Sequence, residues 1–136
     1  DVIKAIKDPK DSTVFIWKLK TYIKYTEDDD ITVTEFGDYC RDSDGNWELH
    51  NYTGKPFGNK EFSEWYFLVK GDNFTWDNAK DGIIKKNKQY VDMSNWTNRS
   101  DTLTAQKGIW YFIGVDSEGN KVCGYDHYEN LPELFD

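Results

Sequence analysis

Residues 14–25 read VFIWKLKTYIKY, and this stretch decides the fold. Apolar and polar side chains alternate along it, and one face is made by the odd-numbered residues Phe15, Trp17, Leu19, Thr21, Ile23 and Tyr25. The other face is mixed and carries Lys18, Lys20 and Lys24. Because successive side chains of a β-strand point to opposite faces, this period of two predicts a long strand with one buried face.

The chain beyond this strand shows the same kind of alternation. We expect strands over 31–40, 47–52, 61–70, 74–76, 102–115 and 121–128, joined by turns rich in Gly, Asp and Asn. Residues 94–101 are interpreted as a loop, and 82–93 fit either a helix or an exposed edge strand. Residues 2–7 are predicted to form a short amphipathic helix that Pro9 limits, because proline disfavours helix at the residue before it.

This succession of strands and short turns predicts an all-β fold in one domain that spans 1–136. The simplest closure is an antiparallel up-and-down barrel with a short N-terminal helix, because a closed barrel leaves no unpaired edge. A two-sheet β-sandwich uses the same signals and is the alternative. Aromatic residues make up 17% of the 136 residues, so the interior must be filled largely by rings.

The charge of the chain limits its partners. A formal net charge of −8 repels nucleic-acid phosphates, and basic and aromatic residues do not interleave as they do in nucleic-acid grooves. No run approaches 18 apolar residues, so no membrane span is expected. The expected partner is a small cationic or amphipathic ligand, or an extracellular protein with a basic surface.

Asparagine sequons predict a secreted, extracellular glycoprotein. Four Asn-x-Ser/Thr triplets begin at Asn51, Asn73, Asn95 and Asn98, where chance placement gives about one. Sequons that are used must be exposed and imply passage through a secretory pathway. Cys40 and Cys123 agree with that compartment, because an even count there most simply means one disulfide. Two buried free thiols are the alternative.

Three local features resemble the lipocalins, in particular the salivary lipocalins of ticks and other arthropods. They are the predicted helix followed by the aromatic strand at 14–19, the late hairpin from Asp116 to Cys123, and the triplet Glu133-Leu134-Phe135, which is similar to a Glu-Leu-Trp triplet of that family. The resemblance implies a ligand-binding barrel in which the acid of Glu133 and the ring of Phe135 face a bound amine. With two cysteines, the chain has fewer than that family.

Catalysis is not expected. The sequence contains no GxSxG, P-loop, HExxH or dinucleotide-binding motif, and no cofactor is predicted. Its two histidines, His50 and His127, are interpreted as residues on strand surfaces. Neither cysteine has a second cysteine at CxxC spacing, so no metal site is predicted.

Binding is better supported, because rings and inward carboxylates in a small barrel supply cation–π contact and charge neutralisation to a protonated amine such as histamine or serotonin. The predicted lining residues are Trp17, Glu35, Tyr39, Trp65, Trp110 and Tyr111, joined by Glu133 and Phe135 from the resemblance. Trp17 and Trp110 also fit a plain core, and Glu35 also fits the exposed end of a strand.

The alternative function is immune modulation by binding a host protein, such as a cytokine, chemokine, complement component or immunoglobulin, through surface aromatics. The sequons would then mark the glycan-shielded side, and the partner would bind elsewhere. A lipid carrier is a third possibility, which the acidic, Tyr-rich composition favours less.

Overall fold

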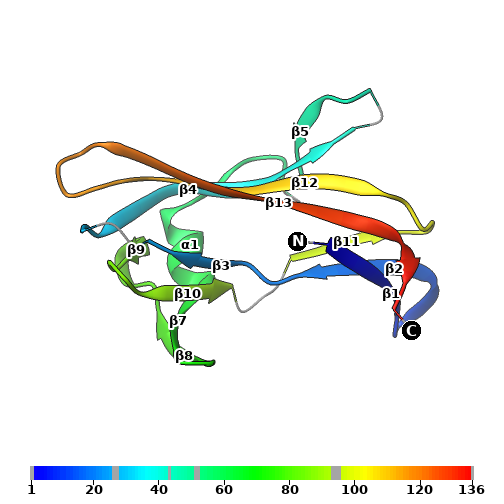
Figure 1. Ribbon diagram of the computed structural model, residues 1–136, viewed down its shortest axis with the longest axis horizontal. Helices are drawn as coiled ribbons and strands as arrows, with labels where there is room; N and C mark the ends of the chain where they lie inside the picture. The colour runs from blue at the N-terminus through cyan, green and yellow to red at the C-terminus, as the bar shows by residue number, and fades with distance from the viewer. Residues whose placement is uncertain (1, 26–27, 43, 51–52, 93–95, 136) are drawn as a thin grey trace.

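The computed structural model describes residues 2–25, 28–42, 44–50, 53–92 and 96–135. Two β-sheets and one short α-helix, α1 (Asn59–Trp65), make up nearly all the regular structure within these ranges (Figure 1). The all-β fold class predicted from the sequence is therefore confirmed. No helix in the described ranges combines the length and the apolar character that crossing a membrane requires.

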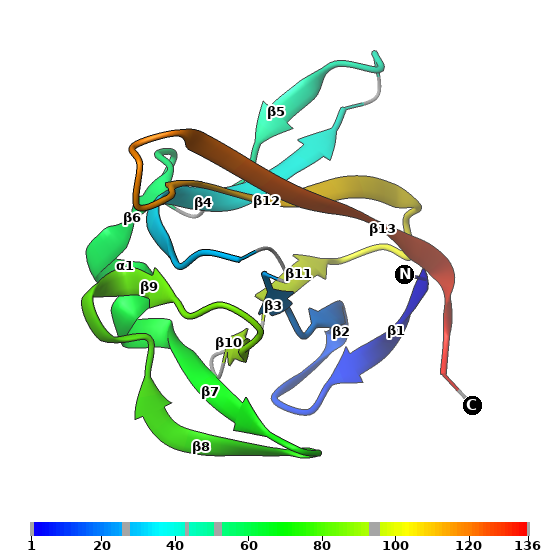
Figure 2. The ribbon, with the colours of Figure 1, turned by 60° about the vertical axis from the view of Figure 1, so that its left-hand side comes forward.

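The larger sheet runs in the order β11-β2-β1-β13-β12-β4-β5. Its strands are β1 (Val2–Asp8), β2 (Asp11–Leu19), β4 (Ile31–Arg41), β5 (Trp47–Leu49), β11 (Trp96–Ser100), β12 (Gln106–Val115) and β13 (Lys121–Leu134). Two short strands, β6 (Phe57–Gly58) and β9 (Ile83–Ile84), also pair with β4. Figure 2 shows how this sheet curls into half a barrel, with β4, β12 and β13 as one wall and β1, β2 and β11 turning back beneath it.

The smaller sheet runs in the order β3-β10-β7-β8, with β3 (Tyr22–Lys24), β7 (Tyr66–Lys70), β8 (Asn73–Asn78) and β10 (Gln89–Asp92). The long strand predicted over 14–25 therefore divides, because β2 enters the larger sheet and β3 the smaller one. Its buried face persists across the division at Trp17, Leu19, Thr21 and Ile23. The hydroxyls of Thr21 and Tyr66 hydrogen-bond at 2.7 Å and fix the crossing point to the smaller sheet.

Two hairpin turns of nearly identical sequence help to set the register of the central strands. They read DSDGN at 42–46 and DSEGN at 116–120. In each turn the first aspartate accepts the backbone N–H of the asparagine at 2.8 Å, and the glycine has a positive φ, 87° in the first and 83° in the second. Glycine adopts this left-handed backbone at no steric cost. Both hairpin predictions are confirmed by the pairing of β4 with β5 and of β12 with β13.

The helix predicted over 2–7 is wrong, because Val2–Asp8 form β1 between β2 and β13. Its pairing with β13 is parallel, so the first strand of the larger sheet lies against the last. An up-and-down barrel places consecutive strands side by side, and the observed strand order departs from that arrangement. An isolated turn of helix is marginal in water, whereas β1 gains hydrogen bonds on both of its edges.

Residues 61–70, predicted as one strand, divide into the end of α1 and the strand β7. Phe62 and Trp65 are three residues apart in α1, which places both on one side of the helix, and Tyr66 follows as the first residue of β7. Glu61 accepts the backbone N–H of Gly58 at 3.1 Å and so caps the first turn. In the segment predicted as a loop over 94–101, residues 96–100 instead pair with β2 as β11.

Phe36 of β4 lies at the centre of the core between the larger sheet and α1. Its ring contacts those of Phe57, Phe62, Trp65 and Tyr66, with ring centroids 5.4–5.8 Å apart. Tilted and edge-on rings at these separations have the favoured geometry for aromatic pairs. The space between β4 and α1 is therefore filled by aromatic side chains.

The structure does not contain the predicted disulfide: Cys40 and Cys123 are both free thiols. Cys40 lies opposite Gly108 of β12, whereas Cys123 lies opposite Ile113 of the same strand. The two positions are therefore five residues apart along β12, which is about 17 Å at ~3.4 Å per residue. A disulfide requires Cα atoms closer than about 7 Å, so the fold keeps the two thiols apart.

Thiol accessibility tests whether Cys40 and Cys123 are free thiols. Cys40 is buried and Cys123 is exposed, so a thiol reagent should modify one cysteine in the native chain and two after unfolding in guanidinium, without any reductant. Intact-mass measurement of wild type and of a Cys123→Ser control gives the number of adducts. The native control should take up none, and a wild-type chain that takes up none after unfolding would show a bridge.

The predicted glycosylation sites differ in exposure. Asn73 is exposed at the start of β8. Asn98 is only 8% exposed and its side-chain nitrogen is buried, so the folded chain does not present this asparagine to a glycan. Asn51 and Asn95 lie outside the described residues.

Candidate functional site

The three tryptophans predicted to line a pocket belong to the interior. Trp17 in β2 is buried and donates its indole N–H to the backbone oxygen of Leu131 at 2.9 Å. Trp65 at the end of α1 packs against Phe57, with ring centroids 4.8 Å apart. Trp110 in β12 is buried in the same aromatic core. Trp17 and Trp110 are therefore core residues, but Trp17 also borders a pocket of about 260 Å³ and Trp110 borders one of about 140 Å³.

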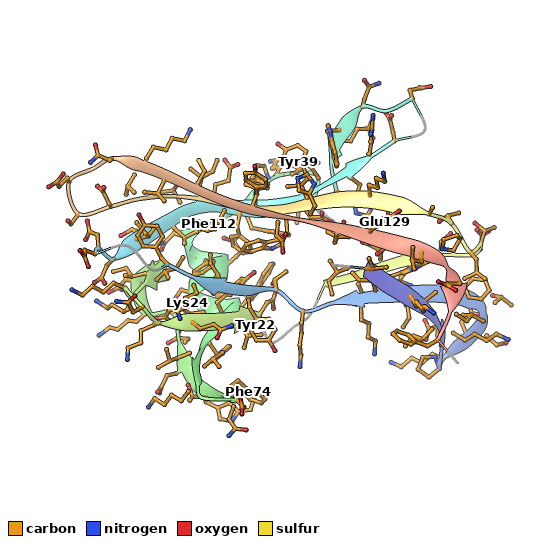
Figure 3. All side chains as sticks on the ribbon, viewed as in Figure 1. Tyr22, Lys24, Tyr39, Phe74, Phe112 and Glu129 are labelled. Atoms are coloured by element: carbon orange, nitrogen blue, oxygen red, sulfur yellow. The ribbon has the colours of Figure 1, made fainter. Side chains whose placement is uncertain are left out.

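Glu35, Tyr39 and Tyr111 do come together, but on the outer face of the larger sheet. Figure 3 shows Tyr39 on this face and Phe112 on the opposite side, towards α1. Tyr111 donates its hydroxyl to Glu35 at 2.7 Å, and its ring centroid is 5.3 Å from that of Tyr39. Burial, aided by the Glu35 carboxylate, raises the pKa of Tyr111, so its hydroxyl remains a hydrogen-bond donor.

We call this surface the outer platform. It consists of side chains on one face of β5, β4, β12 and β13, and directly paired residues on neighbouring strands share a face. Its members are Glu35, Tyr39, Trp47, Leu49, Ile109, Tyr111, Ile113, Tyr125 and His127. Trp47 and Tyr125 are exposed, Tyr125 at 70% of its surface.

Glu133 and Phe135 lie at the C-terminal end of β13 and beyond it. The Glu133 carboxylate is 3.6 Å from the ammonium group of Lys4, and Phe135 is an exposed ring. The backbone N–H of Phe135 donates to the oxygen of Ala5 at 3.0 Å, so this end is fastened to β1. The eight predicted lining residues thus occupy three separate regions, namely the core, the outer platform and the end of β13.

A pocket that combines rings and carboxylates lies instead on the smaller sheet. We call it the sheet pocket; its volume is about 250 Å³, and its lining residues are Lys20, Tyr22, Val69, Asp72, Phe74, Val91 and Asp92. Tyr22 pairs with Val91 across β3 and β10, and Val69 pairs with Phe74 across β7 and β8. These pairs present their side chains on the same face of the smaller sheet.

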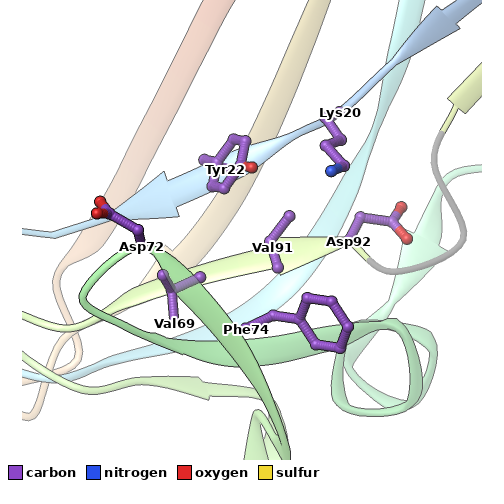
Figure 4. A pocket seen from close by; sticks show the side chains of 7 residues that line it. All are labelled: Lys20, Tyr22, Val69, Asp72, Phe74, Val91 and Asp92. Atoms are coloured by element: carbon purple, nitrogen blue, oxygen red, sulfur yellow. The ribbon is translucent and has the colours of Figure 1, made fainter.

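The arrangement of the sheet pocket suits a small cation. Figure 4 shows the rings of Tyr22 and Phe74 on opposite sides of a floor made by Val69 and Val91, with Asp72 at one end. Lys20 and Asp92 lie at the other end. Both rings are about half exposed, so their faces are open to a ligand. The negative face of an aromatic ring attracts cations. The carboxylate of Asp72 is exposed at the pocket, whereas Asp92 is buried.

Sequence reasoning missed the sheet pocket. Tyr22 stands on the mixed, Lys-bearing face of the predicted strand, and Asp72 and Phe74 belong to a predicted turn and strand. Tyr22 is far from Asp72 and Phe74 in the sequence, and their meeting depends on β10 pairing with both β3 and β7. That long-range pairing has no local signal in the sequence.

A buried polar network lies inside the half-barrel. The Tyr128 hydroxyl donates to both carboxylate oxygens of Asp38 at 2.8 Å, and the Cys40 sulfur is 3.2 Å from that hydroxyl. His50 Nδ1 lies 3.5 Å from the Asp38 carboxylate. Hydrogen bonding to Asp38, with a further contribution from Cys40, raises the pKa of His50 to about 10. Asp38, Cys40 and His50 are the residues in the described ranges that cluster as possible metal ligands.

Gly108 makes this network possible. A Cβ atom at Gly108 of β12 would meet the ring of Tyr128, so the ring lies directly over the glycine. In this way a side chain of β13 crosses the neighbouring strand β12 and reaches Asp38 and Cys40 on β4.

Comparison with known proteins assigns the chain to no family. No protein-family model matches it, and no curated protein matches it. The resemblance to arthropod salivary lipocalins therefore stays a prediction. A function must therefore be inferred from its own sheet pocket, outer platform and buried network.

Replacement of Gly108 tests how the network is held. Gly108→Ala should force the Tyr128 ring away from Asp38 and lower the free energy of unfolding by about 1–3 kcal/mol, as overpacking does. Urea denaturation measures the change. Lys107→Ala, at the neighbouring exposed position of β12, should change it by less than about 0.5 kcal/mol. Equal stabilities of Gly108→Ala and wild type would contradict the contact.

Proposed function

We propose that this chain is a secreted binding protein, not an enzyme, whose sheet pocket takes up a small amine in its protonated form. The observation that supports the proposal is the convergence of two half-exposed rings, Tyr22 and Phe74, with the carboxylates of Asp72 and Asp92 in one pocket. Rings provide cation–π contacts and carboxylates neutralise the charge. The resemblance to salivary lipocalins points to the same class of ligand.

The shape and charge of the sheet pocket favour an amine over a lipid. Its volume of about 250 Å³ is below the ~300–1,000 Å³ of pockets for drug-sized ligands, so the ligand must be small. Asp72 and Lys20 lie towards opposite ends, which favours binding of the ammonium group near Asp72 (Figure 4). The valine floor then contacts the apolar part of the ligand. A net charge of −8 adds a general attraction for cations.

Calorimetric titration with histamine and serotonin tests the sheet pocket. Wild type should bind at least one of them, and added salt should weaken binding because it screens Asp72. Asp72→Asn should weaken the affinity, because the charge near the ammonium group is lost. Phe74→Ala should weaken it about two- to fivefold, as removal of an exposed cation–π contact of ~0.5–1 kcal/mol implies.

Matched controls separate the sheet pocket from general surface effects. Asp77→Asn removes an exposed carboxylate of β8, the strand that contains Phe74, and is the control for Asp72→Asn. Tyr125→Ala removes an exposed ring of the outer platform and is the control for Phe74→Ala. Both should bind amines as wild type does. Absence of heat at millimolar amine, or an equal loss in the controls, would refute the amine proposal.

The outer platform favours a second candidate function, the binding of a host protein. Its rings lie on a sheet face that the described residues leave open, and exposed aromatic side chains are typical anchors of protein interfaces. The exposed sequon asparagine, Asn73, belongs to β8, on the opposite side of the molecule from β12 and β13 (Figure 1). A glycan there would leave the outer platform uncovered.

Surface plasmon resonance against a panel of cytokines, chemokines, complement components and immunoglobulins tests this second function. A panel member that binds wild type should bind the double variant Tyr39→Ala/Tyr125→Ala at least about tenfold more weakly, as loss of interface anchors predicts. Phe74→Ala, in the sheet pocket, should bind it as wild type does. Failure of every panel member to bind, or unchanged binding of the double variant, would argue against the outer platform.

A further inference from the structure

Three side chains of metal-binding type converge at the edge of the half-barrel. Asp38 and Cys40 are two residues apart on β4 and therefore point to the same face. His50 follows β5, and its backbone N–H donates to the backbone oxygen of Asp38 at 2.7 Å. This bond continues the pairing of β4 with β5 and places His50 opposite Asp38. The hairpin therefore brings an acid, a thiol and an imidazole together.

The two separations measured from Asp38 are close to those of a tetrahedral metal site. Asp38 Oδ2 lies 3.8 Å from the Cys40 sulfur and 3.5 Å from His50 Nδ1, and the three potential ligand atoms all lie within 4.8 Å of one another. Typical zinc–ligand bond lengths imply ligand atoms about 3.3–3.6 Å apart around a tetrahedral ion, the larger separation applying to pairs that include sulfur. Shifts of a few tenths of an ångström for the two Asp38 distances would give that geometry.

The surroundings orient Asp38 as a ligand. Its carboxylate accepts the Tyr128 hydroxyl at 2.8 Å, and Asp38 is itself buried in β4. Hydrogen bonds from outside the ligand set are a regular feature of metal sites, because they fix the direction of the ligand oxygen.

A polar pocket of about 260 Å³ adjoins the cluster at His50, and its wall includes Asn98 and Asn130. Asn130 Oδ1 is buried and has no hydrogen-bond partner among the described residues. Asn98 Nδ2 is also buried and makes no hydrogen bond of standard geometry with the described residues. Buried amide groups without a protein partner are usually satisfied by water or a ligand. The pocket therefore suits a polar occupant next to His50.

We propose that Asp38, Cys40 and His50 bind one zinc ion, with a water molecule from the adjoining polar pocket as the fourth ligand. Thiolate and imidazole favour zinc over magnesium or calcium, which prefer all-oxygen sites. Three protein ligands and one exchangeable position are the arrangement of zinc sites that interact with further ligands.

The charge of the bound ion is balanced by its own ligands. Metal ligands bind in their deprotonated forms, so zinc with one carboxylate, one thiolate and one neutral imidazole has zero total charge. The loaded site therefore places no net charge in the interior, where an unpaired charge is costly.

The chain supplies its own matched controls, because it has two cysteines and two histidines and the proposed site uses one of each. Zinc per chain is measured by mass spectrometry after gel filtration, and affinity by competition with a chromophoric chelator. Wild type should bind one zinc ion, and its cobalt form should show a thiolate-to-cobalt charge-transfer band. Cys40→Ser and His50→Ala should each weaken zinc binding at least about 100-fold, and Cys40→Ser should abolish the band.

Cys123→Ser and His127→Ala should keep both the zinc and the band. The His50 side chain is half exposed, so His50→Ala should leave the core intact. Loss of zinc binding in this variant is then not explained by misfolding. Zinc should raise the melting temperature of wild type and of both controls, and leave that of His50→Ala unchanged. No zinc uptake by wild type, or uptake that survives both Cys40→Ser and His50→Ala, overturns the proposal.

Discussion

Strand β12 pairs with β4 along one edge and with β13 along the other, and the rest of the structure depends on this double pairing. Its register sets Gly108 between Cys40 and Tyr128 on the inner face, and Tyr111 opposite Tyr125 on the outer face. One three-stranded wall thus carries a buried polar network on one side and the outer platform on the other. A slip of one residue would exchange the two faces, so both features depend on the same hydrogen bonds.

Much of the fold could be predicted from local patterns. The period of two from Trp17 to Ile23 and the matching DSDGN and DSEGN turns predicted strands and hairpins that the structure contains. The segment 2–7 was misassigned because a short apolar run fits helix or strand equally, and the choice is made by β13, at the far end of the chain. The spacing of Phe62 and Trp65 fits the helix α1, but two residues at this spacing are too few to exclude a strand.

The types of residue that make up the candidate sites could be predicted from the sequence better than the places where these residues meet. Rings combined with carboxylates were expected, but Tyr22 and Phe74 meet only through the pairing of the smaller sheet. The even number of cysteines suggested a disulfide. Composition carries no information about the distance between Cys40 and Cys123, so it could not show that the two residues lie apart. By contrast, the approach of Asp38 to His50 could have been found by counting across the DSDGN hairpin, since Cys40 pairs with Glu48 and Tyr39 with Leu49.

The parallel contact between β1 and β13 has a consequence for biosynthesis. Residues Val2–Asp8 are synthesised well before one of their partner strands, Lys121–Leu134. Until then the nascent chain holds β1 with one unsatisfied edge, and contacts of such long sequence separation form slowly. During that interval the open edge is a site where other chains can pair, so a chaperone that covers it should increase the yield of folded protein.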